Sequence, residues 1–111
     1  MKLPHLENAY VPEAKIIKYL LNLEHKQGGK DKAVFFMRFG FTIESWEVLA
    51  QALLAHAVAY DVASTMPLPD RVHYVVEGEI ISPDNRNPQI RSVWVIETDG
   101  TAPRFVSAYP L

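Results

Sequence analysis

The fold class follows from the segment Val72-His73-Tyr74-Val75-Val76-Glu77-Gly78-Glu79-Ile80-Ile81. Here Val72, Tyr74 and Val76 alternate with other side chains at the two-residue period of a β-strand. Gly78 within this strand predicts a bulge or bend. The residues before it have helical spacing instead. The sequence therefore predicts a helical half over residues 1–62 and a strand half over residues 70–111.

Two more strands are expected after this segment. The stretch from Ile90 to Thr98 has four consecutive apolar residues at 93–96, which is typical of a strand covered on both faces and predicts the middle of the sheet. A hairpin turn at 99–102 leads to a third strand from Arg104 to Tyr109. Residues 63–70, which include Pro67 and Pro69, predict a turn.

Three helices are expected in the first half. The first begins at Pro12 and has an apolar stripe at residues 16, 17, 20 and 21. The second covers residues 31–39, with Gly40 in the left-handed position that ends many helices. The third covers 43–59, with Thr42 as its cap. The prediction is one α+β domain, residues 1–111, with three N-terminal helices packed on a C-terminal three-stranded antiparallel meander.

Composition excludes several functional classes. The 111 residues include no cysteine, which removes disulfides, thiolate zinc sites and thiol nucleophiles. The net charge is −2, so any site for a polyanion must be local. No segment approaches the ~20 apolar residues that span a bilayer, so no membrane association is expected, and the cytoplasm is the expected location.

The sequence contains none of the common nucleotide-binding or hydrolase motifs. It lacks GxxxxGK[ST], GxGxxG, GxSxG, HExxH and CxxC. His73 with Glu77 and Glu79 comes nearest to a metal cluster, but three residues of one strand rarely bind a metal unaided. His56, alone among alanines on the third helix, is expected to be a surface or hydrogen-bonded core residue. We expect no metal and no cofactor.

A basic loop at residues 25–32 is the main candidate site. It contains an imidazole, three lysines and two adjacent glycines that allow the backbone close to a ligand. The loop is either an anion-binding site or an ordinary solvated connection. As ligand-binding residues it offers Lys26, Gly28, Gly29 and Lys30, together with His25 and Lys32.

The chain resembles a family of bacterial domains of unknown function, which occur alone or at the ends of larger bacterial and phage-related proteins. The resemblance covers almost the whole chain. Its first half is represented by KYLLN (18–22), Glu24-His25, Lys32-Ala33 and Phe39-Gly40-Phe41. Its second half is represented by YVVEG (74–78), RSVWVI (91–96) and PRFVSAYP (103–110).

A looser similarity leads to the barnase, EndoU, colicin and RelE group of metal-independent ribonucleases, several of which are toxin domains. The shared features are a His-x-x-Gly-x-x-x-Lys loop and a sheet that ends in a Ser/Thr-x-Tyr-Pro strand. This similarity implies His25 as acid or base, since an unperturbed imidazole has a pKa of about 6.5. It implies Lys30 or Lys32, together with Arg91, as phosphate ligands, Ser107 as a positioning group, and Tyr109 as a stacking platform for a base.

Two functional interpretations stay open, so the sequence does not decide whether the chain is an enzyme. One is a noncatalytic interaction or accessory module that binds a protein partner or an anionic ligand through the 25–32 loop. The other is ribonuclease-like cleavage of RNA, which requires His25 and Arg91 in one cleft. The acidic net charge, a start at Met1 without a delivery module and the lack of a second acid/base group count against cleavage.

A homodimer is also expected from the last strand. Its edge, with Arg104, Val106 and Ala108, would pair with another chain unless something covers it.

Overall fold

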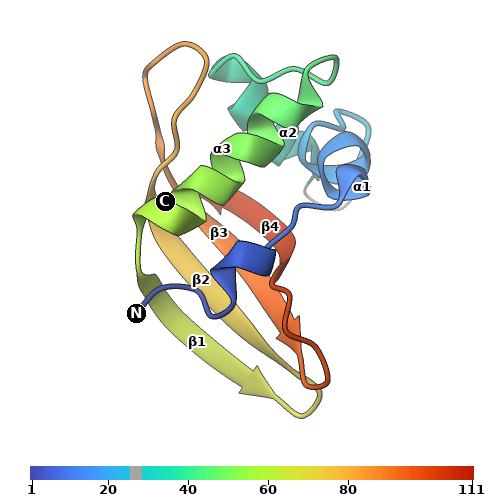
Figure 1. Ribbon diagram of the computed structural model, residues 1–111. Coiled ribbons are helices and arrows are strands. Elements are labelled where there is room, and N and C mark those ends of the chain that lie inside the picture. The colour runs from blue at the N-terminus through green and yellow to red at the C-terminus, as the bar shows by residue number, and fades with distance from the viewer. Residues whose placement is uncertain (26–28) are drawn as a thin grey trace.

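The computed structural model describes residues 1–25 and 29–111 and places helices on one face of an antiparallel sheet (Figure 1). The helical elements are η1 (Leu6–Asn8), α1 (Glu13–Lys15), η2 (Ile16–Leu20), α2 (Gly29–Arg38) and α3 (Trp46–Ala59). The strands are β1 (Val62–Leu68), β2 (Arg71–Glu79), β3 (Gln89–Glu97) and β4 (Arg104–Pro110), in that spatial order. Within the described residues no helix is long and apolar enough to cross a membrane.

The predicted three-stranded meander is wrong, because the sheet has a fourth strand, although the α+β class stands. The additional strand is β1, which occupies most of the stretch expected to be a turn and pairs antiparallel with β2. β1 lies at the edge of the sheet, where a proline such as Pro67 is tolerated. Most of its side chains are exposed, so its sequence shows no alternation of apolar residues.

The helices follow the expected order with different boundaries. Gly40, with φ of 102°, ends α2 in the left-handed conformation, and the Phe41 N–H donates to the Phe36 carbonyl at 3.3 Å, as predicted. Thr42 does not cap α3, which begins at Trp46; its hydroxyl instead accepts the Ser45 N–H at 3.2 Å in the turn before the helix. The first helix consists of α1 and the π-helical turn η2.

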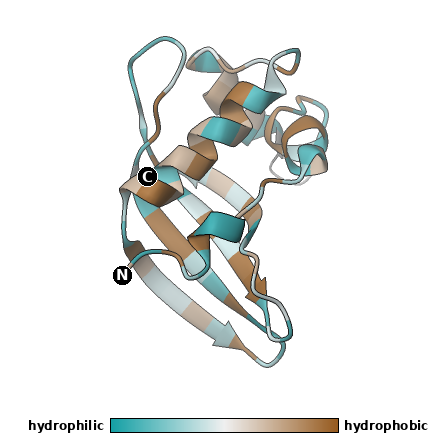
Figure 2. Cartoon of the chain, in the orientation of Figure 1, coloured by the Kyte–Doolittle hydropathy of each residue, from teal (hydrophilic) through white to brown (hydrophobic). Residues whose placement is uncertain are grey.

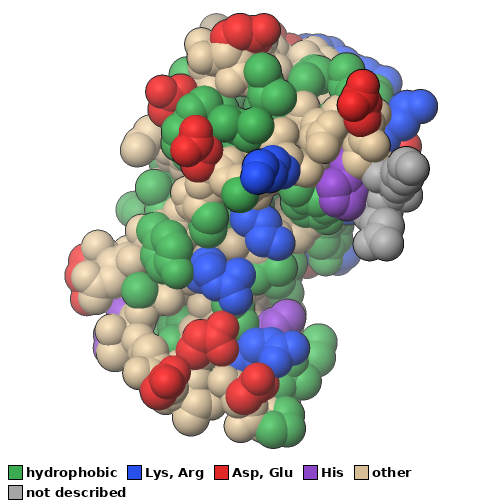
Figure 3. All heavy atoms as spheres, turned by 90° about the vertical axis from the view of Figure 1, so that its right-hand side faces the viewer, with side chains coloured by type: hydrophobic (Ala, Val, Ile, Leu, Met, Phe, Trp, Pro, Cys, Tyr) green, Lys and Arg blue, Asp and Glu red, His purple; other side chains and the backbone are tan. Residues whose placement is uncertain are grey.

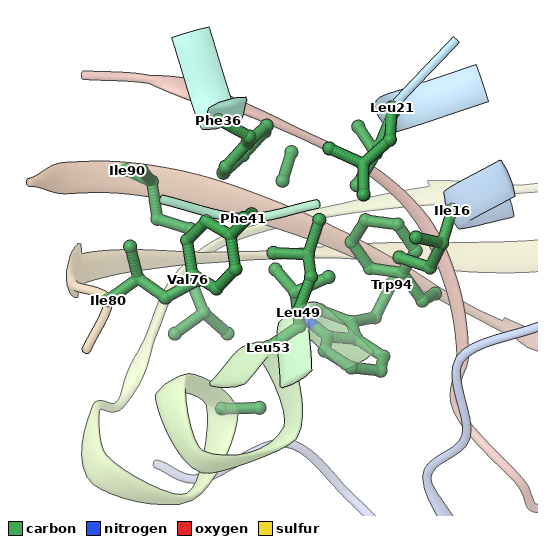
Figure 4. Close-up of a cluster of buried hydrophobic side chains, with 14 of the residues drawn as sticks. Ile16, Leu21, Phe36, Phe41, Leu49, Leu53, Val76, Ile80, Ile90 and Trp94 are labelled. Carbon is green, nitrogen blue, oxygen red and sulfur yellow. The ribbon is translucent and has the colours of Figure 1, made fainter. Parts of the chain in front are cut away.

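The core lies between the helices and the sheet, where brown segments of both layers face each other in Figure 2. Trp94 of β3 is its largest fully buried side chain and contacts the Phe105 ring edge to face, with 5.4 Å between centroids. Figure 4 shows Leu49 and Leu53 of α3 beside Trp94. Val95 is buried as well, which confirms that the centre of β3 is covered on both faces.

A chain of hydrogen bonds crosses this core. The Trp94 indole N–H donates to Ser92 Oγ at 2.9 Å, and Ser92 Oγ lies 3.0 Å from His56 Nδ1. His56 Nε2 lies 3.1 Å from the Gly78 carbonyl, which can only accept. His56 therefore carries its proton on Nε2 and accepts the Ser92 hydroxyl at Nδ1. This confirms His56 as a hydrogen-bonded core residue, and it ties α3 to β2 and β3.

Gly78 does not form the predicted bulge, because it pairs with Ile90 in unbroken register. Its small size serves a different purpose: a Cβ at this position would lie 2.5 Å from the Tyr60 ring. Tyr60 follows α3 directly and packs over the strand here. Register shifts occur elsewhere, between Val62 and Ser64 and between Val93 and Trp94.

Gly78→Ala is expected to lower the free energy of unfolding by ~1–3 kcal/mol, because the added methyl group overlaps the Tyr60 ring. Urea denaturation measures this change. Gly100→Ala is the matched control, since its Cβ would approach other atoms no closer than 3.6 Å. In a Tyr60→Ala background the cost of Gly78→Ala should fall markedly; an unchanged cost would show that the Tyr60 ring is not the cause.

Stability should also depend on pH through His56. Burial lowers the pKa of this imidazole in the folded state below its ordinary value of 6.5. The unfolded chain therefore binds the proton first, and the free energy of unfolding should decrease as pH falls below about 6.5. Thermal unfolding between pH 7.5 and 5 tests this. His56→Gln should flatten the slope, whereas His5→Gln, at an exposed histidine, is the control.

Candidate anion-binding site beside strand β4

A hollow of about 610 Å³ lies where α1 and η2 meet β4. Figure 3 views the molecule from this side, and Lys and Arg side chains gather along the middle of the face. The hollow is open to solvent and has both apolar and polar walls. Its lining residues are Pro12, Ala14, Lys15, Tyr19, His25, Arg104, Val106 and Ser107.

Tyr19 occupies the centre of this site. Its neighbours in η2, Ile16 and Leu20, are fully buried and fix the helical turn against the core. The Tyr19 ring is left only partly buried, and its hydroxyl lies 3.1 Å from Ser107 Oγ on β4. The hydrogen bond therefore joins η2 to the edge of the sheet.

Three basic groups surround the Tyr19 ring. The His25 ring meets it edge to face, with 5.0 Å between the centroids. Lys15 Nζ and Lys32 Nζ each lie 5.5 Å from the centre of the same ring. Lys32 comes from α2, so three separate segments deliver positive or titratable groups to one aromatic side chain.

Arg104 adds a guanidinium to the wall of the hollow. It lies at the start of β4, where Tyr10 forms a parallel bridge to it. The Tyr10 N–H donates to the Pro103 carbonyl, and the Phe105 N–H donates to the Tyr10 carbonyl, both at 3.0 Å. Arg104 Nη2 also reaches Glu97 Oε1 at 3.2 Å. The same bridge covers part of the β4 edge that was expected to pair in a homodimer, and the homodimer stays a prediction.

The structure brings together only some of the predicted site residues. His25, Lys32 and Ser107 gather around Tyr19. Lys30 is exposed on α2, and Gly29 is the first residue of that helix. Lys26 and Gly28 lie outside the described residues.

Arg91 does not line this hollow, so the expectation that His25 and Arg91 share one cleft is not met here. Its guanidinium binds the carboxylate of Glu77 across the strand pair, which raises the pKa of Arg91, and Tyr109 lies opposite it on β4. Thus the sheet places Arg91 and Tyr109 together, while Arg104 supplies the guanidinium beside His25. Whether Arg91 or Tyr109 takes part in function stays a prediction.

Sequence reasoning missed Tyr19, Lys15 and Arg104. Tyr19 and Arg104 lie within the stretches that carry the family resemblance, which was the available signal. Lys15 lies outside those stretches, and no pattern in the sequence distinguished it from the other lysines. Across residues 1–25 and 29–111, no group of three His, Asp or Glu side chains is placed to bind a metal ion. His73 instead lies 3.3 Å from Arg71 Nε, as a hydrogen-bond acceptor.

Comparison with known proteins gives the family. The chain belongs to the family described as domain of unknown function DUF6883, whose model matches residues 2–111. No curated protein matches it. Among solved structures, it is similar to a chain of the "Contact-dependent growth inhibition toxin - immunity protein complex from Klebsiella pneumoniae 342". The identity is 18%, 96% of each chain is covered and the TM-score is 0.72, which establishes a shared fold.

Tyr19→Phe should lower the free energy of unfolding by ~0.5–1.5 kcal/mol, because it removes the partly buried hydrogen bond to Ser107. Tyr10→Phe is the matched control, since the Tyr10 side chain is exposed. Chemical denaturation compares the two. Equal effects of both substitutions would mean that the bond to Ser107 contributes no stability.

Proposed function

We propose that this domain cleaves RNA without a metal ion, with the hollow beside β4 as its active site and a role related to bacterial toxins. The observation that carries the proposal is the convergence on Tyr19. His25 supplies a group for proton transfer, Ser107 and Tyr19 supply hydroxyls, and Lys15 and Lys32 supply cations at the ring. Arg104 adds a guanidinium to the same hollow.

The chemistry requires no group beyond these side chains. The ribose 2′-oxygen bonds to phosphorus as the bond from phosphorus to the 5′-oxygen breaks, which leaves a 2′,3′-cyclic phosphate and a 5′-hydroxyl. A base accepts the 2′ proton and an acid gives a proton to the departing oxygen. Fixed cations stabilise the negative charge that gathers on the phosphoryl oxygens.

His25 and Tyr19 supply the proton-transfer groups in this proposal. The sequence offered no second acid/base partner for His25, and the Tyr19 hydroxyl fills that place. In our assignment His25 takes the 2′ proton and the Tyr19 hydroxyl, held by Ser107 at 3.1 Å, donates to the departing oxygen. Their rings are in contact, with 5.0 Å between the centroids, and both residues line the same hollow, so both can reach one bound phosphate.

The local charge supports an anionic substrate although the whole chain has a net charge of −2. Lys15 of α1 and Arg104 of β4 line the hollow, and Lys32 of α2 lies over the ring of Tyr19, which lines it as well. Glu97 is the carboxylate paired with Arg104 there. A guanidinium has five N–H donors, so it can bind this carboxylate and a phosphate together.

The relation to toxins draws support from the shared fold, since the complex from Klebsiella pneumoniae contains a toxin and its immunity protein. By analogy, we propose that the partner of this domain is a protein that covers the hollow and blocks cleavage. A noncatalytic module that binds an anionic ligand in the same hollow is the alternative outcome of the test below.

Purified protein incubated with mixed cellular RNA in EDTA should produce fragments that end in 2′,3′-cyclic phosphate. His25→Ala and Tyr19→Phe should each reduce cleavage by ~10²-fold or more, the usual size of one acid/base contribution. Lys15→Ala should weaken cleavage, and Lys18→Ala, an exposed lysine of η2 that does not line the hollow, is its matched control.

Binding of single-stranded RNA to a cleavage-deficient variant should weaken with salt. Three phosphate contacts predict a slope of about −2 for the logarithm of the binding constant against the logarithm of salt concentration. RNA that stays intact but binds with this slope would favour the noncatalytic module. If Arg91→Ala abolishes cleavage and Arg104→Ala does not, the assignment of the guanidinium to Arg104 is wrong.

A further inference from the structure

A second hollow, of about 380 Å³, opens on the outer face of the sheet and adjoins the first. Arg104 and Val106 line both, so the two hollows share a wall. The strand register explains the grouping, because Arg71 pairs with Glu97 and Val95 lies between His73 and Arg104. The lining residues are Asp70, Arg71, His73, Val95, Glu97, Arg104 and Val106.

The charges of the second hollow do not favour a phosphate group. Arg71 pairs with Asp70 at 2.7 Å, and Arg104 pairs with Glu97 at 3.2 Å, so two cations face two carboxylates. The floor is apolar, since Val95 is buried and Val106 is half-buried. A hollow with an apolar floor, hydrogen-bond donors and hydrogen-bond acceptors fits a flat, neutral, polar-edged ligand, and its volume lies in the ~300–1,000 Å³ range of small-ligand sites.

His73 holds Arg71 in place. The Arg71 Nε–H donates to His73 Nε2 at 3.3 Å, and Arg71 Nη1 donates to Asp70 Oδ1 at 2.7 Å, so Nη2 forms neither of these bonds. His73 is therefore a positioning residue for Arg71. This arrangement also explains a histidine on the outer face of β2 that the proposed cleavage reaction does not use.

We propose that the second hollow binds the nucleobase next to the cleaved phosphate and that it prefers guanine. This inference rests on the proposed RNA cleavage in the first hollow. Guanine presents two acceptors, O6 and N7, which an arginine contacts together, and two donors, N1–H and N2–H, which a carboxylate accepts. In our assignment Arg71 contacts the acceptors and Glu97, its register partner on β3, accepts from the donors; both residues line the hollow.

The other bases match these groups less well. Adenine carries an amino group where guanine has O6, so the N–H donors of Arg71 would face another hydrogen-bond donor. Uracil and cytosine lack N7, so they do not present the O6 and N7 acceptor pair of guanine to Arg71. Loss of one two-point contact reduces discrimination by about tenfold or more.

The experiment uses uridine-rich RNA oligonucleotides that contain one guanosine, one adenosine or one cytidine at the same position. With wild-type protein in EDTA, kcat/KM for the guanosine substrate should exceed that for the adenosine substrate by about tenfold or more. Cleavage sites are mapped and should lie at a phosphate that adjoins the guanosine. Arg71→Ala should reduce the ratio to under about twofold, and Glu97→Gln should reduce it as well.

Lys2→Ala is the matched control, because Lys2 is an exposed cation that pairs with Asp61 and lines neither hollow. It should keep the wild-type ratio. Equal cleavage of the guanosine and adenosine substrates, or a preference that Arg71→Ala leaves intact, would overturn the guanine site while the proposed cleavage stands. No cleavage of any oligonucleotide, with mixed cellular RNA also intact, would overturn both.

Discussion

The hydrogen-bonded chain from Trp94 through Ser92 and His56 to the Gly78 carbonyl is the constraint on which the rest of the structure depends. All three side chains are buried, so each polar atom must find its partner inside the protein. The two bonds of His56 tie α3 to Ser92 of β3 and to Gly78 of β2, and the bond from Trp94 holds Ser92 within β3. Tyr60, which packs over Gly78, then fixes where the helix ends and where β1 begins.

The shorter helices η2 and α2 pack against the same core as α3. Ile16 and Leu20 of η2 and Phe36 of α2 are fully buried beside Trp94 and Phe105. Residues of η2 that lie between these buried side chains are thereby placed at the edge of the sheet. Tyr19 is the clearest case: the burial of its neighbours directs its ring to β4, where Ser107, His25 and two lysines contact it. The candidate site is thus a consequence of core packing.

Charge is arranged locally rather than globally. The chain has more acidic than basic residues, yet Lys15 and Lys32 both place positive charge beside the Tyr19 ring. On the outer face of the sheet, by contrast, arginines pair with carboxylates. Two adjoining hollows therefore differ in character, one suited to an anion and one to a neutral polar group. Shared residues at Arg104 and Val106 would let a single nucleotide chain occupy both.

The sequence by itself determined the α+β class, the order of helices and strands, the left-handed turn at Gly40 and the covered centre of β3, because these depend on local periodicity and backbone preference. It also pointed to His25, Lys32 and Ser107. Only the tertiary structure revealed the edge strand β1, whose exposed side chains have no apolar alternation. It also revealed that Arg104, and not Arg91, lines the hollow with His25. The edge strand and the position of Arg104 both depend on which segments are neighbours in space. Strand register and helix packing determine these neighbours, and they join residues that are far apart in the sequence, so no local pattern predicts them.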